Sequence, residues 1–281
     1  MKRTLLAALI LAAPTAMPAA VAQTSDWSGL YVGGHLGHSF KADDETVVFD
    51  TDRDGVFDDT VRTSSGANAF APGFCNGGAT GPTITSGCRE SNGDINYSVR
   101  VGYDLQLFGN WVIGVMAEET AANIGDDVSA FSSTPQASYT FTRDLRTLTS
   151  ARARAGWATN DSLLYGTAGW TWGDIDQSFT TTNTVNTFQQ SMESEISGYQ
   201  IGVGYEHRLG DLWLIGSGWT VGLEYLWTSL DEGEHPVAVG PGTAPPTNPF
   251  IIVDPTGTDM RRTKDIFEFS TIGLSLNWRL L

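Results

Sequence analysis

Carboxylates are gathered most densely in one short stretch of this chain. The segment from Asp50 to Asp59 reads D-T-D-R-D-G-V-F-D-D and contains five aspartates. Alternate acidic residues around a glycine turn can converge on a hard cation, as in the first half of an EF-hand loop. An EF-hand would also need an acid at its twelfth position, which is Val61 here, and flanking helices. The predicted Ca²⁺ ligands are Asp50, Asp52, Asp54 and Asp58, with Asp59 as a further oxygen donor.

A solvated acidic loop without a metal is the alternative interpretation of this segment. No cofactor is expected to be required, and Ca²⁺ is the one candidate.

The two cysteines predict a disulfide. Cys75 and Cys88 are the only cysteines, and the stretch between them is rich in glycine, threonine and serine. An exported protein meets oxidising conditions, which favour a disulfide within one loop. Metal binding or redox chemistry would be better served by a C-x-x-C spacing or a neighbouring histidine, and neither is present.

The four histidines do not have the spacing of a catalytic site. His35 and His38 lie on opposite faces of one predicted strand, while His207 and His235 belong to later segments. No Ser-His-acid arrangement can be recognised among them. We therefore expect structural or interfacial histidines and no enzymatic activity, with a lipid-modifying enzyme as a remote alternative.

The elements that position these residues are predicted to be strands. The segment Ile95–Leu107 reads I-N-Y-S-V-R-V-G-Y-D-L-Q-L, with apolar residues at every odd position and polar residues or glycine at every even one. Side chains of a strand alternate between its faces, so one face is apolar and the other polar. Thirteen residues at ~3.3 Å each, tilted by about 45°, rise roughly 30 Å, the thickness of a bilayer's hydrocarbon core.

Segments of this kind recur along the chain and predict an all-β, eight-stranded antiparallel transmembrane barrel. The expected strands are at about residues 27–40, 95–107, 111–124, 139–157, 162–176, 195–208, 218–230 and 262–281. The facing of the fifth cannot be assigned, because its apolar residues do not alternate. Long connections follow the odd strands and short ones follow the even strands, as in outer-membrane barrels with long external loops. The expected external loops are at about 41–92, 125–138, 177–194 and 231–261.

Charged residues on the polar faces are predicted to fill the barrel. An eight-stranded barrel is just wide enough for side chains to occupy its interior. The expected lumen cluster consists of Arg100, Glu118, Arg152, Arg154, Glu206 and Glu224. Glu119 has the parity of the lipid face, which is tolerable near the outer rim.

The N-terminus is typical of a secretory signal peptide. Lys2 and Arg3 precede the apolar run Leu5–Ala13, and Ala20-Val21-Ala22 is a small-residue cleavage site. We expect residues 1–22 to be removed and residues 23–281 to form a single barrel domain. The alternative, a retained anchor, is disfavoured because the run is too short to span a membrane. The whole chain has a formal net charge of −16, which excludes nucleic acid as an expected partner.

Several motifs resemble one family. They are W-S-G-L-Y-V-G-G from Trp27, N-W-V-I-G-V from Asn110, R-A-R-A-G-W from Arg152, G-V-G-Y-E from Gly202, G-L-E-Y from Gly222 and the final T-I-G-L-S-L-N-W-R-L. Together they resemble the small porin-family outer-membrane proteins of alphaproteobacteria, the outer-membrane immunogenic protein type with an OmpA-like eight-stranded barrel. Such proteins usually end on an aromatic residue, whereas this chain ends with Leu281.

The expected function is a structural or surface-interaction role in the outer membrane of a Gram-negative bacterium, either envelope integrity or adhesion. The alternative is a small-solute porin. Expected partners are outer-membrane lipid, lipopolysaccharide and an unknown ligand of the external loops, and we expect the protein to be a monomer.

Overall fold

The structure is a computed structural model, and it describes residues 26–41, 45–91, 95–191, 195–210 and 217–280. The expected signal peptide, residues 1–22, lies outside the described residues. In the described part, helix is limited to the short segments η1 (Ile84–Ser86) and η2 (Pro249–Ile251). Neither they nor any other described segment is a helix long and apolar enough to cross a membrane.

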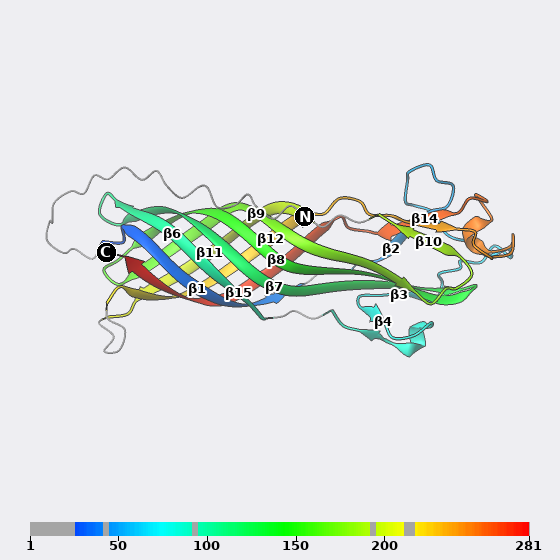
Figure 1. Cartoon of the computed structure of the whole chain (residues 1–281), viewed down its shortest axis with the longest axis horizontal. Helices are drawn as coiled ribbons and strands as arrows, with labels where there is room; N and C mark the ends of the chain where they lie inside the picture. The colour runs from blue at the N-terminus through cyan, green and yellow to red at the C-terminus, as the bar shows by residue number, and fades with distance from the viewer. Residues whose placement is uncertain (1–25, 42–44, 92–94, 192–194, 211–216, 281) are drawn as a thin grey trace, which may run out of the picture.

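Eight long strands pair in a closed antiparallel ring (Figure 1). In ring order they are β1 (Gly29–Phe40), β6 (Ile95–Leu107), β7 (Trp111–Ser133), β8 (Gln136–Ala158), β9 (Ser162–Thr181), β11 (Glu195–Arg208), β12 (Trp219–Asp231) and β15 (Ile266–Leu280). The pairing of β1 with β15 closes the ring. Closure leaves no unpaired strand edge in hydrocarbon, where each unpaired backbone group costs several kcal/mol. The predicted all-β transmembrane barrel is confirmed.

The two faces of each strand have opposite chemistry. On β6, Val99 is 68% exposed on the outside, and its neighbour Arg100 is 3% exposed inside. On β9, whose facing the sequence did not reveal, Leu163, Tyr165 and Ile175 point inward and Trp170 points outward. The small outward residues between them obscure the alternation of hydrophobicity. A continuous exposed apolar band of this size matches a lipid-facing surface.

The barrel strands extend well beyond the membrane at one end. The segment 125–138, which was expected to be an external loop, continues β7 and β8 as a hairpin that turns at Thr134 and Pro135. The pairing of these strands shifts between Ala121 and Ile124, and that of β8 with β9 shifts between Leu145 and Thr147. A bulge changes the facing of the residues beyond it. The alternation of apolar and polar residues is therefore interrupted at the bulges, and it does not reveal the full length of these strands.

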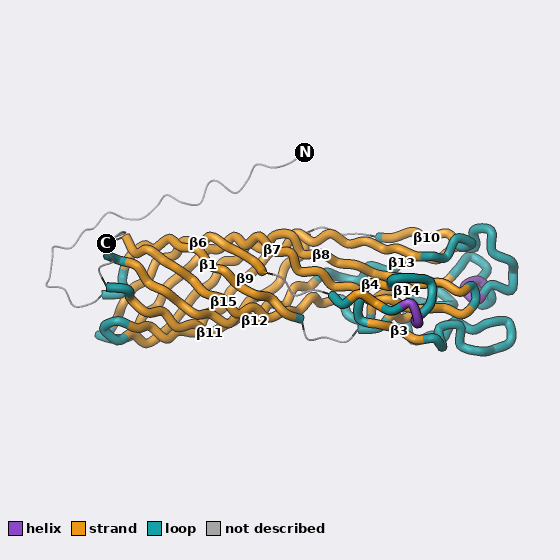
Figure 2. The backbone as a smooth tube through the Cα atoms, turned by 90° about the horizontal axis from the view of Figure 1, so that it is seen from below, coloured by secondary structure: helices purple, strands orange, loops and turns teal. Residues whose placement is uncertain are grey.

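The long connections form a folded cap at this end of the barrel (Figure 2). Four short strands build a separate sheet in the order β10 (Thr187–Gln190), β13 (Val237–Gly240), β14 (Thr258–Arg262) and β2 (Val47–Asp50). A core that includes the outer parts of β7 and β8 lies beneath them. This cap core consists of Val47, Phe49, Val61, Ala69, Phe70, Val128, Ala130, Ala137, Tyr139, Phe141, Val237, Val239, Phe250, Ile251 and Met260. The three remaining predicted external loops thus fold largely as one unit.

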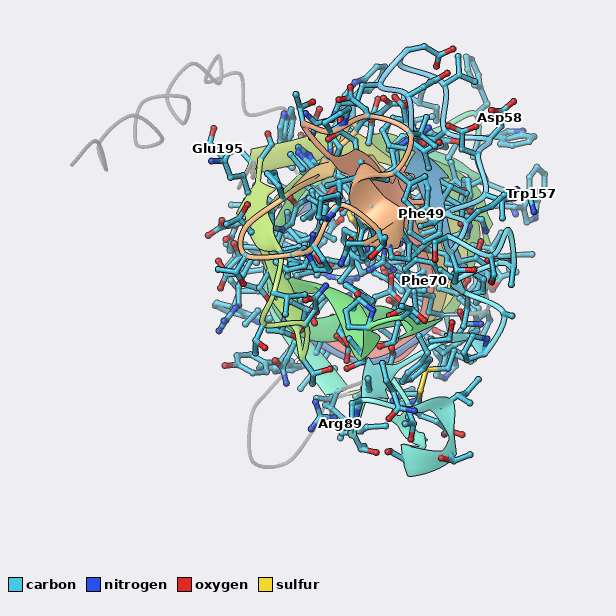
Figure 3. The ribbon with its side chains drawn as sticks, turned by 90° about the vertical axis from the view of Figure 1, so that its right-hand side faces the viewer. Phe49, Asp58, Phe70, Arg89, Trp157 and Glu195 are labelled. Carbon is cyan, nitrogen blue, oxygen red and sulfur yellow. A yellow bond between two sulfur atoms is a disulfide. The ribbon has the colours of Figure 1, made fainter. Side chains whose placement is uncertain are left out.

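A disulfide-linked lobe lies on the side of the cap (Figure 3). Cys75 ends β3 (Gly73–Cys75) and is bonded to Cys88, which begins β5 (Cys88–Arg89), with the Cα atoms 6.5 Å apart. β5 pairs with β4 (Gly78–Ala79), and β3 pairs with the outer part of β7. The side-chain hydroxyl of Ser129 on β7 donates to the Gly77 carbonyl and accepts from the Ala79 N–H. The lobe is therefore fixed to the extended hairpin.

The first and last barrel strands are joined a second time inside the cap. β2 follows β1 in the chain and β14 precedes β15, and β2 and β14 pair from Asp50↔Asp259 to Val47↔Arg262. The β1–β15 ladder of the barrel is in this way followed by a second ladder outside the membrane.

Replacing Gly204 by alanine should destabilise the barrel. A Cβ at this inward position on β11 would lie 2.3 Å from the ring of Tyr165, whose hydroxyl donates to Glu224. We expect Gly204→Ala to lower the free energy of unfolding by about 1–3 kcal/mol, as overpacking does. A Cβ at the outward Gly166 would lie 3.9 Å from its nearest neighbour, the Gly202 carbonyl oxygen, which is an ordinary contact, so Gly166→Ala should stay within about 0.5 kcal/mol. Denaturant unfolding of both variants in the same lipid vesicles measures this, and equal effects would contradict it.

Candidate functional site

Two ion-pair clusters fill the lumen at the end of the barrel with the short turns. The lower cluster consists of Asp104, Arg154, Glu206 and Arg279. Arg154 Nε donates to Asp104 Oδ1 at 2.7 Å, and its Nη1 donates to Glu206 Oε1 at 2.6 Å. Arg279 Nη2 lies 2.8 Å from Asp104 Oδ2 and 3.4 Å from Glu206 Oε2. Two arginines and two carboxylates balance each other here.

The middle cluster lies next to it and consists of Arg100, Glu118, Arg152 and Glu224. Arg100 Nη2 is 2.5 Å from Glu118 Oε2 and 2.9 Å from Glu224 Oε2. Arg152 completes the group through the same two carboxylates, at 3.2 Å and 3.5 Å. All four residues are buried. The six residues expected in the lumen thus divide between the two clusters. Asp104 and Arg279, which were not predicted to belong to a charge cluster, complete the lower one.

The short-turn end of the lumen is closed by Trp27, which is fully buried. Its backbone N–H donates to Gln106 Oε1 at 2.7 Å, and its indole N–H donates to the Thr159 carbonyl at 3.1 Å. The guanidinium groups of Arg208 and Arg279 lie 4.5 Å and 4.7 Å from its ring. Trp27 therefore forms a floor below the lower cluster.

An apolar layer occupies the lumen beyond the middle cluster. It consists of Ile124, Leu145, Leu148, Ile175, Ile196, Leu230, Phe267 and Phe269. Between this layer and the middle cluster is a hollow of about 10 Å³ next to His35 and Gln200. A hollow of that size has room for about one water molecule.

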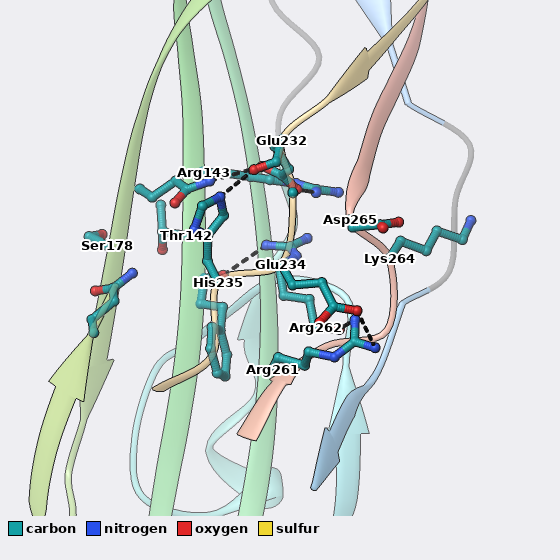
Figure 4. A pocket seen from close by; sticks show the side chains of 14 residues that line it. Thr142, Arg143, Ser178, Glu232, Glu234, His235, Arg261, Arg262, Lys264 and Asp265 are labelled. Carbon is teal, nitrogen blue, oxygen red and sulfur yellow. Dashed lines mark hydrogen bonds and ion pairs between the residues drawn. The ribbon is translucent and has the colours of Figure 1, made fainter. Parts of the chain in front are cut away.

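A third cluster, which was not predicted from the sequence, lies between the apolar layer and the cap. Figure 4 shows three of its members, Arg143, Glu232 and Arg262. This upper cluster consists of Lys41, Glu45, Asp126, Arg143, Glu232 and Arg262. Arg143 is 1% exposed and contacts three carboxylates, with Nε donating to Asp126 Oδ2 at 2.6 Å and Nη2 donating to Glu45 Oε1 at 2.5 Å. Its third partner is Glu232 at the end of the β12 ladder.

Positive and negative charges are also equal in number in the upper cluster, and their environment sets the ionisation of its members. Burial alone would raise the pKa of Asp126, but the surrounding Arg262, Arg143 and Lys41 lower it to about 2. Burial lowers the pKa of Arg143 and of Lys41, and the neighbouring cations add to this effect. Phe141, Arg143 and Leu145 have the same parity and face inward together. All three lie within the predicted strand 139–157, whereas Asp126 lies in the segment that was expected to be a loop.

The aspartate-rich loop brings together a different set of carboxylates from the one predicted. Ligand atoms of Asp50, Asp52 and Asp59 lie within 4.8 Å of one another, whereas Asp54 and Asp58 are not in this group. Asp54 instead donates its backbone N–H to Asp50 at 3.2 Å. Neighbouring carboxylates contribute to raising the pKa of Asp52, after the effect of desolvation. The N–H and hydroxyl of Thr51 lower the pKa of Asp59. Calcium binding here stays a prediction.

The remaining polar residues of interest are dispersed. His35 is buried in the lumen and His38 is exposed on the outer face of β1. His207 is exposed on β11, and His235 lies near the upper cluster in Figure 4. Glu119 is exposed on the lipid side and accepts a hydrogen bond from Thr149. Thr149 pairs with Trp172, so Glu119 lies at the level of an exposed tryptophan near the cap end.

The fold and the filled lumen can be compared with known proteins. The profile of a family described as outer membrane protein beta-barrel domain matches residues 5–279. This chain belongs to that family. Its barrel therefore resides in the outer membrane of a Gram-negative bacterium. In barrels of this kind the short turns face the periplasm and the long connections face outward, which is the orientation we expect here.

Two relatives have similar sequences. The "31 kDa outer-membrane immunogenic protein" of Brucella melitensis and that of Brucella suis are each 24% identical to this chain over 228 residues, which is 80% of both chains. These relatives are of the type that the motifs resemble.

Among solved structures, OprG from Pseudomonas aeruginosa has a TM-score of 0.42 and 9% identity, covering 91% of this chain and 98% of that one. Ail of Yersinia pestis, solved with the heparin analogue sucrose octasulfate, has a TM-score of 0.33 and 10% identity, covering 92% and 100%.

Removing the carboxylate of Asp126 should weaken the junction between barrel and cap. Asp126→Asn leaves three cations, the buried Arg143 and the partly buried Lys41 and Arg262, with two carboxylates. Breaking a buried ion pair costs about 3–5 kcal/mol. In the parent protein the contribution of Asp126 is present above the unfolded pKa of about 4 and is lost as pH falls through about 2.

Denaturant unfolding between pH 2 and 7 measures this contribution. The stability of Asp126→Asn should fall less than that of the parent at the acid end. The matched control is Asp176→Asn, whose exposed pair with Arg146 should contribute less than about 1 kcal/mol. Equal losses in the two variants would contradict the assignment.

Millimolar Ca²⁺ should raise the melting temperature of the purified protein if the Asp50, Asp52 and Asp59 carboxylates bind it, because a ligand of the folded state stabilises that state. Asp52→Ala should abolish the rise and the calorimetric binding signal. Asp58→Ala removes the same charge from the same loop and should retain both. A response that survives Asp52→Ala, or no response in the parent protein, would rule out calcium at this site.

Proposed function

We propose that this protein is a non-conducting outer-membrane anchor for an external recognition cap, with an envelope-stabilising or adhesin-like role. The observation that carries the proposal is the filling of the lumen at successive levels. Trp27 forms the floor, the lower and middle clusters lie above it, and the apolar layer and the upper cluster follow. Ions would have to displace buried ion pairs and then cross a layer of aliphatic and aromatic side chains.

The energetics of the clusters favour a plug over a selectivity filter. Charges that line an aqueous pore are hydrated, whereas the side chains of Arg100, Arg152 and Glu224 are fully buried. Breaking a buried pair by removing one partner costs about 3–5 kcal/mol. A small-solute porin, the transport-class alternative, would need these pairs to separate.

The cap supplies the surface that a recognition role requires. Its core contains aromatic rings in close contact, such as Phe49 and Phe70 with centroids 4.3 Å apart. The cap is therefore a packed unit able to present side chains in fixed positions. The related Brucella proteins are described as immunogenic, which agrees with display at the cell surface. Lipopolysaccharide and an external ligand of the cap are the partners we propose.

A non-enzymatic role agrees with the distribution of the histidines. Within the described residues, neither His35 in the lumen nor His235 at the upper cluster is hydrogen-bonded to a serine, threonine or cysteine. Each has a buried ring nitrogen without a described protein partner. His207 does contact the hydroxyl of Ser162, at 3.1 Å, but both residues are exposed near the periplasmic turns, and Tyr205 is the other partner of that hydroxyl. Among the described residues, no buried acid is hydrogen-bonded to His207, as one is to the histidine of a catalytic triad.

Planar-bilayer recording tests the function. We expect no steady single-channel currents from the pure protein, because the three clusters and the apolar layer remain in place. A large trimeric porin recorded in the same membranes is the control for incorporation. Steady unitary currents that scale with salt concentration would overturn the non-conducting role.

A further inference from the structure

The outer surface of the cap contains a hollow of about 220 Å³, which shares Asp59 with the candidate calcium loop but is otherwise separate from it. It lies between β2, the chain at residues 57–61 and the segment 68–74. The chain at 57–61 is attached to the edge of β2 by a hydrogen bond from the Asp59 N–H to the Phe49 carbonyl at 3.1 Å. Figure 3 shows Asp58 at the rim of the cap and Phe49 and Phe70 further inside.

The floor of the hollow is aromatic and rigid. Phe49 and Phe70 are buried members of the cap core, and Phe74 stacks on Phe70 with ring centroids 6.4 Å apart. Val61 is also buried, and its carbonyl accepts a hydrogen bond from Ala69. The hollow therefore exists in the folded cap without rearrangement of its walls.

The rim of the hollow is acidic. Asp58 is exposed, and within the described residues it has neither a hydrogen bond nor an ion pair. Asp59 is positioned by Thr51, whose N–H and hydroxyl both donate to Oδ2, at 2.7 Å and 2.8 Å. Its second carboxylate oxygen is not used in these bonds.

Within the described residues, no lysine or arginine forms an ion pair with Asp58 or Asp59. None of the described residues that line the hollow is basic. In the neighbouring segments, Arg53 pairs with Asp259 and Arg62 donates to the Gly66 carbonyl. Arg261 pairs with Glu234, and its guanidinium lies 4.6 Å from the ring of Phe57. That contact shows that Phe57, which lines the hollow, already accepts a cation on its ring.

The size and chemistry of the hollow define its occupant. Pockets for drug-sized ligands measure about 300–1,000 Å³, so this one fits a smaller group such as one long side chain. Lysine and arginine place an apolar stem on apolar surface and keep their charge at the polar edge. Aromatic rings attract such cations, and unpaired carboxylates attract them further.

We propose that this hollow is a docking site for a lysine or arginine side chain of an extracellular protein partner. The stem contacts Phe49, Phe70 and Phe74, and the cationic head lies between Asp58 and Asp59. The proposal rests on the recognition role of the cap and names the chemistry of its partner.

Short peptides test the site in the mature full-length protein, reconstituted in lipid nanodiscs. The probes are blocked pentapeptides of glycine with lysine, arginine, norleucine or glutamate at the centre, titrated by ligand-observed NMR with EDTA present so that no Ca²⁺ competes at Asp59. We expect the two basic peptides to bind and the norleucine and glutamate peptides to bind at least about tenfold more weakly, because they lack the charge-assisted contact.

Two variants and one control locate the binding. Asp58→Asn should weaken the basic peptides by about tenfold, since it removes the unpaired carboxylate while the residue makes no contact that folding needs. Thr60→Trp should fill the hollow and abolish binding without changing the charge. The control is Glu90→Gln, which removes one exposed carboxylate elsewhere in the cap and should leave binding unchanged.

The proposal is overturned if the norleucine peptide binds as tightly as the lysine peptide, if Asp58→Asn has no effect, or if Glu90→Gln weakens binding equally. The last result would indicate attraction to the acidic surface as a whole. Failure of the proposed docking site is distinguishable from failure of the anchoring role, because bilayer recordings of the same preparation report separately on conduction.

Discussion

The rest of this structure depends on the requirement that no backbone polar group be left unpaired in hydrocarbon. Eight strands satisfy it by closing into a ring, and the ring in turn fixes an interior so narrow that side chains fill it. Once closure is imposed, every second residue of each strand faces that interior. The charges found there have no solvent, so they are arranged as balanced groups around Arg100, Arg154 and Arg143. Both features follow from the absence of water: in the hydrocarbon it requires the ring to close, and in the narrow lumen it requires the charges to pair.

The same ladder that spans the membrane also builds the outside of the molecule. β7 and β8 continue past the membrane-spanning part of the barrel, and their outer halves supply Val128, Ala137 and Phe141 to the cap core. The shorter strands of the cap pack against this rigid hairpin. Arg143 joins the two regions, because its guanidinium binds carboxylates of the upper cluster and lies 4.9 Å from the ring of Phe267 in the apolar layer. Barrel and cap therefore share one hydrogen-bonded and packed interior.

The sequence predicted those parts of the fold in which apolar and polar residues alternate with a period of two. Ile95–Leu107 is a strand over its full predicted length, because its alternation is uninterrupted from end to end. The lumen charges on β6, β7 and β8 followed from the same parity. The facing of β8 reverses between Leu145 and Leu148, however, and a bulge leaves no mark on composition. The position of Asp126 and Arg143 in a buried cluster was hidden for that reason.

The aspartate loop shows another limit of sequence reasoning. Spacing alone placed Asp54 and Asp58 with Asp50 and Asp52, whereas the turn uses the Asp54 backbone as a donor and brings Asp59 inward instead. Which carboxylates converge depends on contacts with Thr51 and on the pairing of the 57–61 segment with β2. Those contacts are set by tertiary structure.

The second ladder, between β2 and β14, can form only after the whole barrel has been synthesised and assembled. Its strands flank the first and last strands of the barrel in the chain, so they meet only when the two ends of the sequence have come together. Contacts of such long sequence separation form late and slowly. A chain that has not yet closed its barrel lacks this part of the cap sheet, and partners outside the cell therefore encounter the finished surface only on fully assembled molecules.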